Sequence, residues 1–235
     1  GEDANGDLVA SGQLAITDPD AGEAFFNAAT VSGTHGALTI DASGAWTYSV
    51  DNTRPEVQEL QDGDELKDTV TVTSVDGTEQ SIEITIIGTN DVAVISGDIA
   101  ASLTEDANGD LVASGQLAIT DADLNESVFS TDPARVVLDG VEVVMDGTHG
   151  SLEIDRAGAW TYSVDNTLDA VQSLGEGQFL TDTAIVKSVD GTEQSIEITI
   201  TGTNDVPVIS GNTFGSVTED EFLAVSGQLD ITDAD

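Results

Sequence analysis

Apolar and polar residues alternate along much of this chain with the period of two that is typical of β-strands. Around the turn Asp-Ala-Ser-Gly at residues 41–44, the alternating apolar positions are Leu38, Ile40, Trp46, Tyr48 and Val50. Two alternating runs joined by such a turn predict a β-hairpin.

A second hairpin is predicted over residues 68–86, with Asp76 and Gly77 in its turn. Its inward positions are expected to be Val70, Val72, Ile82, Ile84 and Ile86. Threonine at the intervening positions suits the solvated face of an antiparallel sheet. Residues 54–61 contain the only helix-like pattern, read as a single turn that packs through Val57 and Leu60. Many short strands with frequent turns predict an all-β fold of immunoglobulin-like or cadherin-like antiparallel β-sandwiches.

The whole pattern repeats along the chain. The sequence from Glu2 to Asp18 recurs from Glu105 to Asp121, and Asp91 recurs as Asp205, 205 − 91 = 114 positions on. A third copy starts near Val217. A period of about 100 residues matches a small domain rather than a solenoid unit. We therefore expect repeats at residues 1–91, 92–205 and 206–235, the first and last truncated, joined by short stiff linkers into an extended rod.

The chain is strongly acidic, because its 235 residues contain 45 acidic and only 5 basic side chains, a net charge of −40. Such an excess opposes compaction unless the chain is disordered or binds cations, and the strand patterns argue against disorder. Nucleic acid and anionic membrane surfaces would be repelled. The sequence has no cysteine and no apolar run long enough for a membrane span, so we expect neither disulfides nor membrane insertion.

Three acidic motifs recur around the repeat boundaries: an Asn-Asp stop, a Glu-Asp pair and an Asp-x-Asp motif. Their residues are the candidate metal ligands. The Asn-Asp stops, each at the end of a repeat, are Asn90–Asp91 and Asn204–Asp205. The Glu-Asp pairs are Glu2–Asp3, Glu105–Asp106 and Glu219–Asp220, and the Asp-x-Asp motifs consist of Asp18 and Asp20, Asp121 and Asp123, and Asp233 and Asp235. In extended chain, the two carboxylates of Asp-x-Asp point the same way and repel unless a cation lies between them. Ca²⁺ takes six to eight oxygen ligands, so we expect calcium at each boundary, against the alternative of solvated loop carboxylates.

Other polar and aromatic positions are expected to be structural. Trp46 and Trp160 lie on the apolar faces of their strands, which favours core packing over ligand stacking. His35 and His149, in Gly-Thr-His-Gly, are interpreted as turn residues rather than metal ligands. The acidic turns at Asp51, Asp76, Asp110, Asp165 and Asp190 are weaker metal candidates, because their sequences are ordinary turn sequences.

The first copy contains, in this order, the motifs Gly-Thr-His-Gly, Trp-Thr-Tyr-Ser-Val-Asp-Asn-Thr, Ser-Val-Asp-Gly-Thr-Glu and Gly-Thr-Asn-Asp, and the second copy repeats them. This order resembles the VCBS repeat of large bacterial surface proteins, and the stretch around Val217–Asp235 resembles the cadherin-like repeats of the same proteins. The resemblance implies extender domains of RTX-type adhesins that are exported by type I secretion, bind calcium, and serve attachment or biofilm formation outside the cell. In cadherins, Glu, Asp-x-Asp and an Asp-x-Asn-Asp linker hold the boundary calcium. The resemblance carries that role to Asn90, Asp91, Glu105, Asp121 and Asp123 and to their equivalents, although this linker lacks the first Asp.

We therefore expect a calcium-stiffened spacer, whose partners are the neighbouring repeats of its own chain. One alternative is a glycan-binding or surface-binding module that uses the enlargement between Asp121 and His149, although residues 134–145 also read as a longer hairpin turning at Asp139 and Gly140. Another is self-association into a filament or surface layer. An enzyme is not expected, because no nucleophile and base pattern, phosphate loop or histidine-rich metal site occurs.

Overall fold

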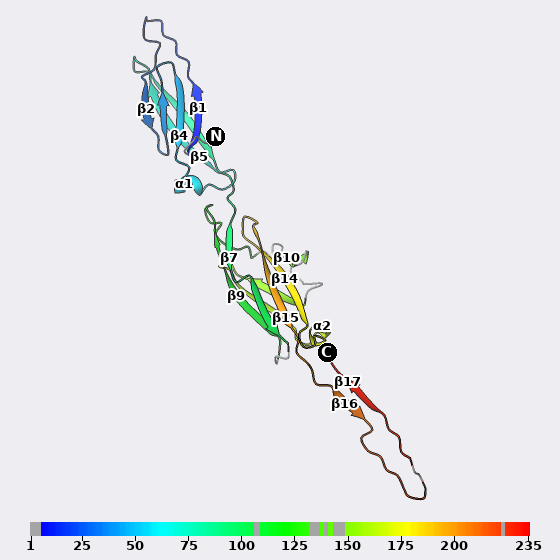
Figure 1. The fold of residues 1–235 in the computed structure, drawn as a ribbon. Coiled ribbons are helices and arrows are strands. Elements are labelled where there is room, and N and C mark those ends of the chain that lie inside the picture. The colour runs from blue at the N-terminus through cyan, green and yellow to red at the C-terminus, as the bar shows by residue number, and fades with distance from the viewer. Residues whose placement is uncertain (1–5, 106–108, 132–136, 139–140, 143–148, 222–223) are drawn as a thin grey trace. The chain divides into compact units, whose positions relative to one another are not determined.

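The computed structural model describes all residues except 1–5, 106–108, 132–136, 139–140, 143–148 and 222–223. The chain forms two compact units (Figure 1). The first comprises Gly1–Val92 together with Asp121–Ser127, and the second comprises Ala93–Thr120 together with Val128–Asp235. The loop Asp121–Ser127 belongs to the second sequence copy, but it is part of the first compact unit.

The first unit is a sandwich of two antiparallel sheets. Its elements are β1 (Leu8–Gln13), β2 (Ala29–Ser32), β3 (Ala37–Ile40), β4 (Ala45–Val50), α1 (Pro55–Gln58), β5 (Glu65–Thr73) and β6 (Glu79–Ile87). One sheet has the strand order β1-β4-β3-β2, and the other consists of β5 and β6. This antiparallel arrangement confirms the predicted fold class.

Both predicted hairpins of the first unit are present. Strands β3 and β4 pair with Leu38 opposite Tyr48, and β5 and β6 pair with Val70 opposite Ile82. The predicted inward positions of both hairpins are buried except for Trp46, which is partly buried against the same core. The predicted helical turn is α1, where Pro55 occupies the first turn and Val57 is buried. Alternation at period two therefore identified the core of this unit.

The second unit repeats this plan with additional strands. Its elements are β7 (Val94–Gly97), β8 (Ala100–Thr104), β9 (Leu111–Thr120), β10 (Val137–Leu138), β11 (Val141–Glu142), β12 (Gly150–Ile154), β13 (Ala159–Val164), α2 (Asp169–Gln172), β14 (Phe179–Lys187), β15 (Glu193–Thr201), β16 (Val208–Gly211) and β17 (Leu229–Thr232). The facing sheets have the orders β12-β13-β9-β7 and β11-β10-β14-β15-β8, and β16 pairs with β17 in a separate two-stranded sheet. All these pairings are antiparallel except that of β8 with β15.

The core of the second unit consists of buried apolar and aromatic side chains. Trp160, Tyr162 and Phe129 are among its largest fully buried side chains. The Trp160 indole N–H donates to the Asp98 carbonyl oxygen at 3.0 Å, so its one polar atom is satisfied. The prediction that the tryptophans pack in the cores is confirmed.

The enlargement of the second copy is described only in part. Strands β10 and β11 pair antiparallel, with Leu138 opposite Val141, which is the hairpin that the sequence predicted. The predicted turn residues Asp139 and Gly140 lie outside the described residues. In the part of the chain that the structure describes, no helix has the length and apolarity needed to cross a membrane.

Candidate metal centres

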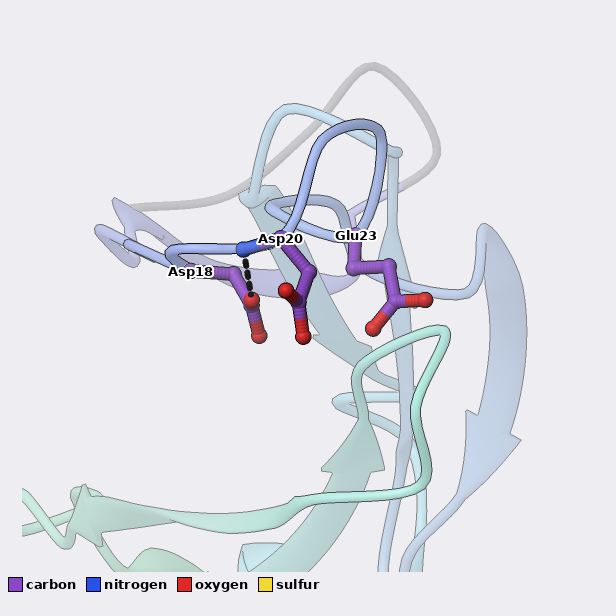
Figure 2. A group of neighbouring side chains, drawn as sticks. All are labelled: Asp18, Asp20 and Glu23. Atoms are coloured by element: carbon purple, nitrogen blue, oxygen red, sulfur yellow. Dashed lines mark hydrogen bonds between the residues drawn. The ribbon is translucent and has the colours of Figure 1, made fainter.

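A first group of carboxylates gathers in the loop after β1. Asp18, Asp20 and Glu23 each place one carboxylate oxygen within 4.8 Å of the others, and Figure 2 shows the three side chains extending to the same side of the loop. The backbone N–H of Asp20 donates to Asp18 Oδ1 at 2.8 Å, which tightens the turn. Three negative charges in this space repel one another, and their oxygens are of the kind that Ca²⁺ takes as ligands.

Asp76 lies on the border of the same region. Asp18, Ser74 and Asp76 line a cavity of about 220 Å³. The hydroxyl of Ser74 donates to Asp76 Oδ1, and the backbone N–H of Thr78 donates to the same oxygen at 3.3 Å. These hydrogen bonds lower the pKa of Asp76, the Ser74 bond most of all. Asp76 therefore remains ionised and faces the same cavity as Asp18.

A second group lies in the loop Asp121–Ser127 of the first unit. Asp123 is only 2% exposed, and its Oδ2 accepts the backbone N–H of Asp91 at 2.7 Å. The other oxygen of this carboxylate, Oδ1, is also buried and has no hydrogen-bond partner among the described residues. Buried polar atoms in proteins almost always have a partner, which can be another protein group, an ordered water or an ion.

Several hydrogen bonds hold this loop in place. Leu124 donates its N–H to the Glu59 carbonyl oxygen at 3.3 Å and accepts the Gln61 side-chain amide at 2.8 Å. Within the loop, the N–H of Asp123 donates to Asp121 Oδ1 at 2.9 Å, the same turn that Asp18 and Asp20 form. The first unit therefore brings Asp91, Asp121 and Asp123 together through hydrogen bonds of Asp123.

Glu105 does not join that group, contrary to expectation. It is 3% exposed, its N–H donates to the Thr201 carbonyl oxygen at 3.1 Å, and its Oε1 accepts the N–H of Thr203 at 2.6 Å. The reason is the register of β8, which runs parallel to β15 and ends beside Thr201. Glu105 therefore lies next to the Asn204–Asp205 stop rather than the Asn90–Asp91 stop.

Asp205 has acidic neighbours of its own. A hydrogen bond with Asp235 is the largest of the effects that raise the pKa of Asp233, and the negative charges of Asp235 and Asp205 raise it further. One oxygen of Asp205, Oδ2, is buried without a hydrogen-bond partner among the described residues. The Asn204–Asp205 stop is therefore combined with the Asp-x-Asp motif of Asp233 and Asp235, as the Asn90–Asp91 stop is combined with that of Asp121 and Asp123.

The remaining predicted ligands are placed less tightly. The side-chain amides of Asn90 and Asn204 donate to the carbonyl oxygens of Asp91 and Asp205, at 2.5 and 2.6 Å, and both asparagines are exposed. Glu219 and Asp220 are exposed. The predicted ligands Glu2, Asp3 and Asp106 lie outside the described residues.

Two of the weaker acidic candidates, Asp51 and Asp190, accept hydrogen bonds within their own turns. Asp51 accepts the N–H and the hydroxyl of Thr53, and these bonds lower the pKa of Asp51. Asp190, the counterpart of Asp76 in the second copy, accepts the Thr192 hydroxyl at 2.6 Å and also the N–H of Ala93 at 3.4 Å. Asp190 is thus hydrogen-bonded to Ala93, which lies two residues after the Asn90–Asp91 stop.

Sequence reasoning missed Glu23 and its counterpart Glu126. Both copies contain Asp-x-Asp-x-x-Glu, at Asp18–Glu23 and at Asp121–Glu126, with identical spacing. That shared spacing was the available signal. It predicts that both glutamates serve the same purpose as the Asp-x-Asp carboxylates before them.

Sequence reasoning also missed a buried carboxylate in each unit. Asp68 is 1% exposed and accepts the backbone N–H groups of Thr34, His35 and Gly36 at 2.8 to 3.0 Å, as well as the hydroxyl of Tyr48 at 2.8 Å. Burial raises the pKa of Asp68, but the hydrogen bonds from this loop and from Tyr48 outweigh it and lower the pKa to about 2. Asp68 occupies an inward strand position in register with Val70 and Val72, which was the signal for it.

The second unit builds the same network around Asp182. Its Oδ2 accepts the N–H groups of His149 and Gly150, at 3.0 and 3.1 Å, and the hydroxyl of Tyr162 at 2.5 Å. Burial and the bond to Asp182 raise the pKa of the Tyr162 phenol. Both histidines lie in loops that their backbone N–H groups fasten to the buried carboxylates, and His149 Nδ1 also lies 3.2 Å from Asp182 Oδ1.

One protein family matches part of the chain. Residues 2–88 match the family described as the bacterial cadherin-like domain. Comparison with curated protein sequences gave no match. The matched residues make up less than half of the chain and lie in the first sequence copy.

Solved cadherin ectodomains resemble the chain at low sequence identity. Cadherin domains 1–4 of protocadherin gamma B7 share 14% identity with a TM-score of 0.42, over 97% of this chain and 55% of that one. Domains 3–6 of protocadherin gamma B7, solved as a cis-dimer, share 16% identity with a TM-score of 0.46, over 96% of this chain and 52% of that one. The human desmocollin-1 ectodomain shares 13% with a TM-score of 0.32, over 94% and 42%. The chain spans about half the length of these structures.

Proposed function

We propose that this chain is a series of cadherin-like extender repeats from an extracellular adhesion protein, in which calcium ions bind at the repeat boundaries and stiffen the series into a rod. The repeats are residues 1–91, 92–205 and 206–235. The ligands at the first boundary are Asn90, Asp91, Asp121 and Asp123, with Glu126 added. The role is structural rather than enzymatic.

The buried carboxylate of Asp123 carries this proposal. One of its oxygens accepts the N–H of Asp91, and the other is buried without a partner among the described residues. An ionised group in such a place costs several kcal/mol unless it is paired or coordinates a metal. No lysine or arginine forms an ion pair with Asp123 in the described part of the chain, so a cation is the partner that fits.

The second boundary supports the same conclusion with different residues. Asp205 has a buried oxygen without a described partner, and its charge contributes to the raised pKa of Asp233. The register of β8 adds Glu105 to this boundary. We assign Asn204, Asp205, Glu105, Asp233 and Asp235 to the second site.

The proposed mechanism is mechanical. Calcium neutralises carboxylates that otherwise repel, and it joins the Asn-Asp stop of one repeat to the Asp-x-Asp loop of the next. Extracellular modules bind calcium with Kd values of about 10⁻⁴ to 10⁻³ M, so the rod would stiffen at millimolar external calcium and stay loose where calcium is scarce. The net charge of −40 makes such a dependence stronger, because the uncompensated chain repels itself.

The finer assignment follows the motif order alone. We propose that the repeats are of the VCBS type and belong to an RTX-type bacterial adhesin that is exported by type I secretion and serves attachment or biofilm formation. In that setting, the repeats project a distant binding domain away from the cell surface.

Thermal unfolding in chelator and in calcium tests the proposal. Trp46 lies in the first unit and Trp160 in the second, so variants that keep only one tryptophan report on one unit each. With a Kd of about 0.1 mM, 10 mM calcium stabilises a unit by about 2.7 kcal/mol for each site that it completes. We expect both units to melt several degrees higher in calcium, and Asp123→Asn to abolish this gain in the first unit.

Matched controls make the result specific. Glu153→Gln removes one negative charge from an exposed strand position and should leave the calcium gain unchanged. Magnesium and sodium chloride at equal ionic strength should produce much smaller shifts, because Mg²⁺ is too small for such a site and Na⁺ carries only one charge. Equal shifts in calcium and sodium chloride would show that the carboxylates are merely solvated, and the proposal would be abandoned.

A further inference from the structure

The loop Asp121–Ser127 and its counterpart in the first copy, Asp18–Ala24, form the same turn from partly different residues. Both loops keep two aspartates and a glutamate at the same spacing. In each loop the N–H of the glutamate donates to the carbonyl oxygen of the second aspartate, at 3.4 Å in the first copy and 3.3 Å in the second. The residues that differ between the loops are therefore not needed to form this turn.

The third position of the turn has a positive φ in both copies. Gly22 occupies it in the first copy with a φ of 91°, and Asn125 occupies it in the second copy with a φ of 68°. Glycine adopts this conformation without strain, and asparagine visits it more readily than most other residues. Asparagine is therefore compatible with the turn, but glycine forms the turn equally well.

Asn125, Glu126 and Ser127 form the sequence Asn-x-Ser, in which x is not proline. This is the acceptor sequence of N-linked glycosylation, and the side-chain amide of the asparagine is the point of attachment. The first copy has Gly22 and Ala24 at the two defining positions and so lacks the sequence. No other asparagine of the chain is followed two positions later by serine or threonine.

The structure leaves the Asn125 side chain accessible. Asn125 and Ser127 are both exposed, and the Asn125 side chain makes no hydrogen bond in the part of the chain that the structure describes. The preceding residue, Leu124, is hydrogen-bonded through its backbone to Glu59 and Gln61, which fixes the loop on that side. The acceptor amide is therefore held at the surface of the first unit without a competing partner.

The hydroxyl of Ser127 joins the two ends of the loop. It accepts the N–H of Asp121 at 2.8 Å and donates to the Asp121 carbonyl oxygen at 3.3 Å. Threonine at this position would keep the hydroxyl, and alanine would remove it. Because Ala24 stands at the equivalent position of the first copy, the turn tolerates alanine.

We infer that Asn125 is a site of N-linked glycosylation, at which a glycosyltransferase that recognises Asn-x-Ser attaches a sugar from a glycosyl diphosphate donor. Asn125 Nδ2 forms the new bond to the anomeric carbon of the sugar. The bond from that carbon to the diphosphate breaks, the diphosphate leaves with the electron pair, and one amide proton passes to a base of the transferase. The inference rests on the proposed extracellular function, since such sugars are attached to surface loops of secreted proteins.

Transfer of a sugar to the folded full chain tests the accessibility of the site. The chain is incubated with an N-glycosyltransferase that recognises Asn-x-Ser and Asn-x-Thr and with uridine diphosphate glucose, once in chelator and once in calcium. We expect the intact mass to rise by one hexose in both conditions, and the modified peptide to contain Asn125. The other asparagines of the chain serve as internal controls and should stay unmodified.

Three variants separate the acceptor sequence from the shape of the loop. Asn125→Gly introduces the residue of the first copy, so it should abolish the increase in mass and leave the melting temperature in chelator and in calcium unchanged. Ser127→Ala should also abolish the increase in mass, whereas Ser127→Thr should preserve it. An increase in mass that persists in Asn125→Gly would assign the sugar to another residue and overturn the inference.

The protein recovered from outside the cells that produce it gives the decisive measurement. Peptide mass analysis should find Asn125 carrying a sugar, and an unmodified Asn125 there would overturn the inference. Failure of transfer to the folded chain, when a peptide of residues 121–129 is modified, would overturn it as well, because the loop would then hide the sequence. Neither result bears on calcium at the boundaries, which the change in melting temperature tests separately.

Discussion

Substitution of Asp68 by asparagine should destabilise the first unit selectively. The carboxylate of Asp68 fastens the loop at Thr34–Gly36 to the core and accepts the Tyr48 hydroxyl. Asparagine has nearly the same shape, but its amide offers one acceptor oxygen where the carboxylate offers two. Its NH₂ group would then face a backbone N–H that has lost its acceptor.

The magnitude follows from the pKa and from the hydrogen bonds. A fall in the pKa of Asp68 from 3.8 to about 2 corresponds to about 2 kcal/mol of stabilisation at neutral pH. A buried donor left without an acceptor costs about 1–3 kcal/mol. Because these two contributions overlap, we expect Asp68→Asn to lower the unfolding free energy of the first unit by about 2–4 kcal/mol at pH 7.

The dependence on pH gives the sharper result. The pKa of Asp68 is lower in the folded state than in the unfolded state, so its stabilising contribution is complete above about pH 4 and is lost as the pH falls toward 2. The difference between the wild-type protein and Asp68→Asn should therefore stay constant from pH 7 to about 5 and then shrink by about 2 kcal/mol.

Urea unfolding followed through Trp46, in a variant that lacks Trp160 and in the presence of chelator, measures this difference. Glu79→Gln is the control, because it removes the same charge from an exposed position on β6. A loss below about 1 kcal/mol at pH 7, or a difference that does not shrink between pH 5 and 2, would refute the role assigned to the buried carboxylate.

Three further predictions concern packing and the second boundary. Gly36→Ala would place a Cβ 2.4 Å from the Ser49 carbonyl oxygen, so the first unit should lose about 1–3 kcal/mol in urea unfolding, and an unchanged midpoint would contradict this packing. Phe129→Ala removes a side chain that is 0% exposed and should cost the second unit about 3–5 kcal/mol, whereas a loss below 1 kcal/mol would mean that the ring is not part of the core. Glu105→Gln preserves an acceptor for the Thr203 N–H but removes the charge, so calcium should raise the melting temperature of the second unit less than in the wild type. The first unit should respond to calcium normally in that variant, and an equal loss in both units would contradict the assignment of Glu105 to the second boundary.

The sequence by itself determined the strands and the repeat. Alternation at Leu38–Ile40 and Val70–Val72 reflects one apolar face per strand, and it depends only on neighbours along the chain. The turn at Asp76–Gly77 is equally local, since glycine adopts the positive φ of 91° that the turn requires. Local rules therefore sufficed to predict these elements and the all-β fold.

Only the tertiary structure decided which acidic groups meet. Glu105 follows the Asn90–Asp91 stop in sequence, yet the register of β8 on β15 carries it to Thr203, 98 positions on. Asp68 receives hydrogen bonds from a loop more than thirty positions away. Spacing along the chain indicates that carboxylates recur, but strand pairing between distant segments decides their neighbours, because register is fixed by burial across the whole sandwich.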